Sequence, residues 1–137
     1  MSLSGGEALA DDEFAWFAAP SFAPRAGEPL RLANLAPPCG VRAVALRALE
    51  TARVPWSEAF LGGGIAAVCA AVSAGIAVAP LARRIAPLGS VDVGRALGLP
   101  RLPKSRVMLY SRVSDARAKA ALRTLAAVFR ARAATGR

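Results

Sequence analysis

Short apolar runs alternate with turn residues along the first half of the chain. Residues 14–19 and residues 30–35 have the length and composition of buried strands, and proline lies next to each run. After the break Pro37-Pro38-Cys39-Gly40, apolar residues recur at helical spacing over residues 41–49, which predicts a helix. Residues 56–61 predict a third strand, which runs into three consecutive glycines.

The alternation continues through the middle of the chain. Residues 65–74 predict a helix of small residues, with Gly75 as its left-handed C-terminal residue. Residues 76–79 predict a buried strand that Pro80 terminates. Residues 83–104 contain several prolines and glycines, and they predict loops around short elements.

The last part of the chain predicts one strand and one helix. The strand covers residues 106–110, and either Ser114 or Asp115 caps the helix. One apolar stripe is expected along this helix, consisting of Ala118, Ala121, Leu122, Leu125, Val128 and Phe129. Strands that alternate with helices favour an α/β sheet over a helical bundle.

Composition narrows the classes of function. The chain has 137 residues, which suits one domain, and its 55% hydrophobic content excludes a disordered chain. The formal net charge is +9, but the basic residues are scattered and nearly all arginine. This pattern favours a solvated surface over a nucleic-acid-binding patch.

The residues that carry chemistry are few. Histidine is absent, and Cys39 and Cys69 have neither metal-ligand nor disulfide-framework spacing. We therefore expect no enzyme, no metal and no cofactor. The N-terminus is polar and acidic rather than a signal peptide, so a cytoplasmic protein with no membrane partner is expected.

Residues 59–82 carry no charge and could in length cross a bilayer. A strand–turn–helix–strand accounts for the glycines and Pro80 in this stretch, which argues against a membrane span. Gly62-x-Gly64-x-x-Ala67 also matches a dinucleotide fingerprint, followed by Arg83-Arg84 where a 2′-phosphate would lie. A Rossmann-like oxidoreductase fragment is therefore the alternative function. In the preferred interpretation the glycines form a tight turn, and the following helix start meets a small anion.

Several segments, taken in order, resemble the effector-binding domain of LysR-type transcription regulators. Residues 9–20 are similar to that family's strand crossing between subdomains, and residues 29–42 to its next strand and helix start. Residues 70–80 are similar to the family signature V-x-x-G-x-G-I-x-x-x-P. Leu99-Pro100 and residues 107–110 resemble the return crossing, so the resemblance covers roughly residues 9–130.

The resemblance implies an α/β fold of the periplasmic-binding-protein type 2 kind, with a mixed sheet flanked by helices. The polar residues 1–12 indicate a flexible leader, and the resemblance assigns residues 13–137 to the effector-binding domain. Within that domain, residues 20–105 correspond to the second lobe, and residues 13–19 and 106–132 to the hinge strands and terminal helix of the first lobe. An incomplete first lobe is expected, and DNA would be bound only through a helix-turn-helix domain absent from this chain.

The resemblance also places a ligand pocket before the first helix. By position it gives Pro38, Cys39 and Gly40, with Val78 and Ala79 facing the same cleft, and the chemistry of the helix starts adds Arg42, Gly63 and Gly64 as candidates. Free N–H groups at a helix start, with a charge-assisted hydrogen bond from Arg42, suit a carboxylate. We therefore expect a regulatory domain that binds a small anionic effector and couples binding to a DNA-bound homo-oligomer, a dimer or tetramer.

Overall fold

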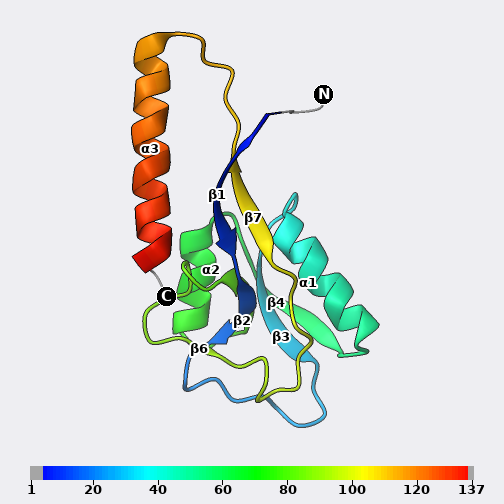
Figure 1. Cartoon of the computed structure of the whole chain (residues 1–137). Coiled ribbons are helices and arrows are strands. Elements are labelled where there is room, and N and C mark those ends of the chain that lie inside the picture. The colour runs from blue at the N-terminus through cyan, green and yellow to red at the C-terminus, as the bar shows by residue number, and fades with distance from the viewer. Residues whose placement is uncertain (1–4, 136–137) are drawn as a thin grey trace. The chain divides into compact units, whose positions relative to one another are not determined.

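The structure, a computed structural model, describes residues 5–135 and divides into two compact units (Figure 1). The central unit is the continuous segment Phe14–Pro103. The terminal unit combines the two ends of the chain, up to Glu13 and from Lys104 onward.

A mixed sheet forms the middle of the central unit. Its strands are β2 (Phe14–Ala18), β3 (Leu30–Leu35), β4 (Trp56–Gly62), β5 (Ala79–Ala82) and β6 (Val91–Asp92). β3 and β4 are parallel, whereas β2 is antiparallel to both β5 and β6. Val78 joins these two parts, because its N–H donates to Arg31 O and its carbonyl accepts from Ala33 N, each at 2.9 Å. Through this bridge the two-stranded sheet β4-β3 and the three-stranded sheet β5-β2-β6 meet edge to edge.

Two helices cover opposite faces of this sheet, α1 (Gly40–Thr51) and α2 (Ile65–Ser73) (Figure 1). Alternate residues of the strands supply the two faces, as the period of a strand requires. The core under α1 contains Trp16, Ala18, Leu32, Ala45, Leu49 and Val78. The core under α2 contains Ala15, Phe17, Ala33, Val68, Ala71, Val72, Ala77, Ala79 and Leu81. The central unit is therefore a three-layer α/β/α arrangement.

The terminal unit consists of β1 (Glu7–Asp12), β7 (Ser105–Leu109) and α3 (Ala116–Thr135). β1 and β7 pair in the antiparallel direction. Arg130 on α3 reaches β1, where Nη2 donates to Glu7 Oε1 at 2.6 Å and to Ala8 O at 2.9 Å. Of the two predicted caps of this helix, Asp115 accepts the hydrogen bond from Ala118 N, at 2.9 Å.

The strands and helices predicted from residue 14 to residue 74 are confirmed within one or two residues, and Gly75 has the predicted positive φ of +74°. For residues 1–12, which the sequence assigns to a flexible leader, the structure differs from the prediction. Residues 7–12 form strand β1, because their partner strand β7 lies far away in the sequence and leaves no local signal. Residues 1–4 of that segment lie outside the described residues.

The predicted end of the strand at Pro80 is wrong. β5 begins at Ala79 and continues through Pro80, which lies opposite Trp16 of β2. β5 has a ladder on one side only, since its link to β3 is the bridge at Val78. A strand with an open side tolerates proline, whose missing N–H can face that side.

The predicted stripe on α3 is only partly correct. Ala126 is the one fully buried residue of the helix, with 1% of its surface exposed. Ala118, Leu122 and Phe129 are partly buried on the same face. Ala121 is exposed, and Leu125 and Val128 are 57% and 49% exposed, so the buried face of the helix is centred on Ala126.

Candidate functional site at the carboxyl edge of β3 and β4

Both helices of the central unit start at the same edge of the sheet. β3 and β4 are parallel, with Leu35 opposite Gly62, and Ala36 N donates to Gly62 O at 2.9 Å just beyond the strands. α1 and α2 follow these strands directly. The carboxyl ends of parallel strands and the N-termini of the helices after them form the usual ligand edge of an α/β sheet.

The start of α1 combines an open glycine with a cysteine cap. Cys39 is the N-cap residue, and its Sγ accepts a hydrogen bond from Arg42 N at 3.5 Å. Pro38 and Gly40 are exposed, and a Cβ on Gly40 would have no atom within 4 Å apart from its chain neighbours and the backbone of its own helix. A ligand can therefore approach the backbone closely at Gly40.

The start of α2 is more open still. Gly64 is the N-cap residue and, with no side chain, makes no capping hydrogen bond to the first turn. Gly63 and Gly64 are exposed, and a Cβ on either of them would have no atom within 4 Å apart from its chain neighbours. Gly62 differs, because a Cβ there would lie 3.0 Å from the Phe60 ring and 3.1 Å from Val68. The three glycines therefore combine one close packing contact with two open positions.

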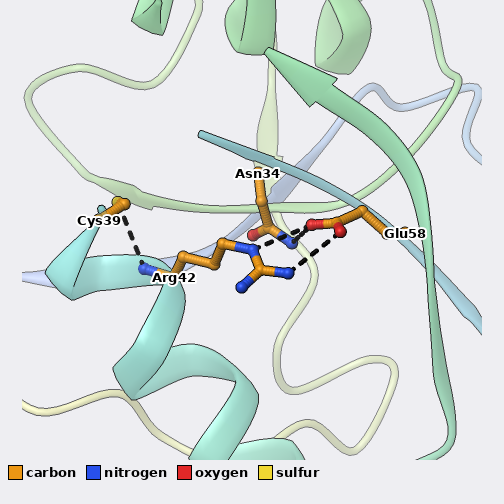
Figure 2. Close-up of polar contacts among 4 residues, drawn as sticks. All are labelled: Asn34, Cys39, Arg42 and Glu58. Atoms are coloured by element: carbon orange, nitrogen blue, oxygen red, sulfur yellow. Dashed lines mark hydrogen bonds and ion pairs between the residues drawn. The ribbon is translucent and has the colours of Figure 1, made fainter. Parts of the chain in front are cut away.

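A polar cluster lies beside the start of α1 (Figure 2). Glu58 of β4 binds Arg42 through both oxygens, with Nε–Oε1 and Nη2–Oε2 distances of 3.0 Å. Asn34 of β3 donates from Nδ2 to Glu58 Oε1 at 3.3 Å. The hydrogen bond from Arg42 is the main reason that the pKa of Glu58 is lowered, and the same bond raises the pKa of Arg42. Both groups are therefore held in their charged forms.

The other end of the Asn34 side chain lacks a partner. Asn34 is 1% exposed, and its Oδ1 accepts no hydrogen bond from any described residue. The carboxylate of Glu58 requires a donor, so Nδ2 faces Glu58 and Oδ1 points to the opposite side of the amide (Figure 2). A buried acceptor of this kind is stabilised by a donor brought to it.

The structure brings most of the predicted site residues to this edge. Pro38, Cys39, Gly40 and Arg42 lie at the start of α1, and Gly63 and Gly64 at the start of α2. The guanidinium of Arg42 binds the carboxylate of Glu58. Val78 and Ala79 are 0% exposed and lie in the two apolar cores of the central unit, not at its surface with the other residues.

Sequence reasoning missed Asn34 and Glu58. Asn34 is the one polar uncharged residue in the apolar strand that contains it, and a buried polar residue in such a strand is an available signal. Glu58 becomes its neighbour only through the parallel register of β3 and β4, which places Leu32 opposite Glu58. That register is a long-range property and leaves no local pattern.

Two other properties bear on the rival functions. Within residues 5–135, no helix is both long and apolar enough to span a membrane. Over the same residues, no three side chains of the metal-ligating types come together. Arg83, which the dinucleotide alternative places near a 2′-phosphate, donates to Asp92 Oδ2 at 2.7 Å and lies over the Phe17 ring at 5.8 Å.

Known proteins similar to this chain are transcription regulators. The chain is 31% identical over 94 residues to the HTH-type transcriptional regulator PecT of Dickeya dadantii (strain 3937), covering 69% of this chain and 30% of PecT. The regulatory domain of Synechocystis PCC6803 CcmR, solved in complex with 2-PG, aligns with a TM-score of 0.65 and 16% identity, over 91% of this chain and 66% of that one. The bromide-bound regulatory domain of Salmonella typhimurium HypT aligns with a TM-score of 0.61 and 16% identity, over 93% and 67%.

These similarities confirm the predicted fold class, an α/β fold of the periplasmic-binding-protein type 2 kind with a mixed sheet flanked by helices. The chain spans less than a third of the length of PecT and about two thirds of the two regulatory domains. The family described as LysR substrate binding domain matches residues 4–134. The chain therefore belongs to the LysR substrate-binding domain family.

Proposed function

We propose that this chain is the effector-sensing part of a LysR-type transcription regulator and binds a small anion where α1 and α2 begin. The observation that carries the proposal is the convergence of two helix N-termini on one edge of the sheet, beside the unsatisfied Oδ1 of Asn34. Each N-terminus presents a partial positive charge and free N–H groups.

The attraction for an anion would come from the helix starts rather than from Arg42. The charge of Arg42 is neutralised by Glu58, which binds it through two hydrogen bonds. The open positions at Gly40, Gly63 and Gly64 would let an oxyanion approach the backbone. Pro38 and Cys39 would border the ligand at the start of α1, with Val78 and Ala79 packed behind this surface.

Asn34 defines a second requirement for the ligand. Its buried Oδ1 would accept a hydrogen bond, so the preferred effector carries a hydroxyl or N–H donor in addition to its acidic group. We infer that a hydroxy acid or an amide-bearing acid suits the site better than an acid without a donor. The CcmR and HypT regulatory domains were solved with 2-PG and bromide, respectively, and both ligands serve as probes here.

The test is a titration of the whole chain with 2-PG and with bromide, followed by thermal unfolding and by backbone amide spectra. A ligand at 100 times its Kd raises the free energy of unfolding by about 2.7 kcal/mol, so binding is visible as a higher Tm. The expected chemical-shift changes lie at Gly40, Gly63 and Gly64.

A matched pair of variants locates the site. Gly63→Asp adds a negative charge at the start of α2, where there is room for a side chain, and should abolish the increase in Tm. Ala70→Asp adds the same charge to an exposed position further along α2 and should leave it intact. The proposal is wrong if both variants bind the probes equally well, or if neither probe changes the wild-type Tm.

A further inference from the structure

A cavity of about 190 Å³ opens at the other end of β3, away from the candidate site. Its lining includes Leu30 and Arg31 at the start of that strand, together with Val54 and Pro55 just before β4. The candidate site lies at the carboxyl end of the same strands, about 15 Å away at the rise of 3.3 Å per residue. The two places share no residue.

The walls of this cavity are mainly apolar. Phe22, Leu30, Val54, Leu97 and Leu99 line it, and all five are partly buried residues at the border of the core under α1. Apolar walls with a few fixed polar groups are typical of small-molecule sites. A cavity of about 150 Å³ with apolar walls can hold benzene, so this volume suits a single six-membered ring with a small substituent.

Arg31 supplies a fixed positive charge in this cavity. Its guanidinium lies over the Phe22 ring, with Cζ 4.9 Å from the ring centroid, and Nη2 donates to Ala23 O at 3.0 Å. A guanidinium has five N–H donors, and this is the one hydrogen bond that the Arg31 guanidinium donates to the described residues. The group is therefore held in place while most of its donors stay available.

The charge balance around the cavity favours an anion. Its lining contains Arg25, Arg31 and one carboxylate, that of Glu28. Glu28 Oε2 lies 3.6 Å from Arg25 Nη1, so these two charges offset each other and Arg31 is left as the net charge. A planar carboxylate matches the geometry of the guanidinium.

We propose that this cavity is a second ligand site, which binds a small aromatic carboxylate through Arg31 and the apolar walls. The ring would lie against Val54, Leu97 and Leu99, and the carboxylate would accept hydrogen bonds from Arg31. The site is independent of the proposed effector site, because it lies at the opposite end of the strands and uses different residues.

Benzoate is the probe, and benzamide is its uncharged counterpart of nearly the same shape. We expect benzoate to bind the whole chain with a Kd of about 1 mM, as measured by amide chemical shifts at Val54, Leu97 and Leu99. Benzamide should bind at least about tenfold more weakly, since it cannot form the charge-assisted pair with Arg31. This comparison uses the wild-type protein and does not depend on the folding of a variant.

Three variants sharpen the test. Arg31→Gln should weaken benzoate binding about tenfold or more, and Val54→Phe should fill the cavity and weaken both ligands. Arg47→Gln removes an exposed arginine of α1 outside the cavity and should change neither Kd.

Equal affinity for benzoate and benzamide overturns the proposal, as does the absence of shifts at the cavity residues up to about 20 mM benzoate. Shifts confined to Gly40 and Gly63 also overturn it, since benzoate would then occupy the other site.

Discussion

At the scale of single residues, Glu58 links the stability of the central unit to pH. Its pKa is lowered below the ordinary value of 4.5, chiefly by the hydrogen bond from Arg42. A carboxylate with a lowered pKa in the folded state stabilises the fold above its unfolded pKa, and this stabilisation is lost as pH falls through the folded pKa. The stabilisation is therefore complete at neutral pH and decreases below pH 4.5.

The corresponding prediction concerns Glu58→Gln. The variant should have a lower Tm than the wild type at neutral pH, and the difference should shrink as pH falls below 4.5. Thermal unfolding over a series of pH values measures this. Glu50→Gln, an exposed position on α1, is the control and should show no such trend. A Tm difference between Glu58→Gln and the wild type that is the same at every pH contradicts the link between Glu58 and the pH dependence of stability.

Asn34 gives a second prediction at this scale. Asn34→Asp would place a carboxylate in a site that is 1% exposed, next to Glu58, and should lower the free energy of unfolding by about 3 kcal/mol at pH 7. Burial and the charge of Glu58 would raise the pKa of this new carboxyl, so the loss should diminish as pH falls. Asn34→Leu, which removes the unsatisfied acceptor without adding charge, should cost less. Urea unfolding at pH 7 and at pH 5 distinguishes these outcomes, and equal stability of Asn34→Asp and wild type at pH 7 contradicts the prediction.

At the scale of elements, α1 is held to the sheet by its buried face. Leu49 is 0% exposed in the core that also contains Trp16 and Leu32. Leu49→Ala should lower the free energy of unfolding by about 3 kcal/mol, through lost burial and the cavity left behind. Leu88→Ala makes the same chemical change at a fully exposed position of the same unit and should change it by less than about 0.5 kcal/mol. Urea unfolding measures both values, and similar losses contradict the assigned burial.

Elements with a local signal could be predicted from the sequence. The apolar runs of β2 and β3 and the helical spacing of α1 are such signals, and their boundaries agree with the structure. Local patterns could not predict β1 or the extent of β5, because β1 depends on a distant partner and the proline in β5 is tolerated only on the side without a ladder. For β1, the family resemblance alone indicated a strand, from residue 9 onward. The face of α3 that packs on β1 was misplaced for the same reason.

The same distinction between local signals and long-range contacts applies to the candidate site. The helix starts at Gly40 and Gly64 could be located from glycines and strand ends along the chain. The cluster of Asn34, Arg42 and Glu58 could not, because three different elements contribute its members. Sequence alone also suggested that Arg42 would bind the ligand, whereas its guanidinium donates two hydrogen bonds to the carboxylate of Glu58.

At the scale of the whole molecule, we expect the chain to self-associate through exposed apolar residues of α3. α3 exposes 57% of Leu125 and 49% of Val128, and exposed apolar side chains on one helix favour association. Sedimentation velocity should show a species larger than the monomer at high concentration. The double variant Leu125→Glu, Val128→Glu should reduce the fraction of this larger species, whereas Thr124→Glu on the same helix should not. A monomer at every concentration contradicts this prediction.

Because the two chain ends together build the terminal unit, we expect the molecule to fold in a defined order. Glu7 pairs with Leu109, so β1 and β7 close a loop that contains the whole central unit. Closing so long a loop in an unfolded chain is entropically costly, and prior folding of the central unit shortens it. The terminal unit should therefore form last and open first. Amide hydrogens of β1 and β7 should exchange with solvent through this partial opening, while those of Leu32 and Ala33 exchange only when the whole molecule unfolds.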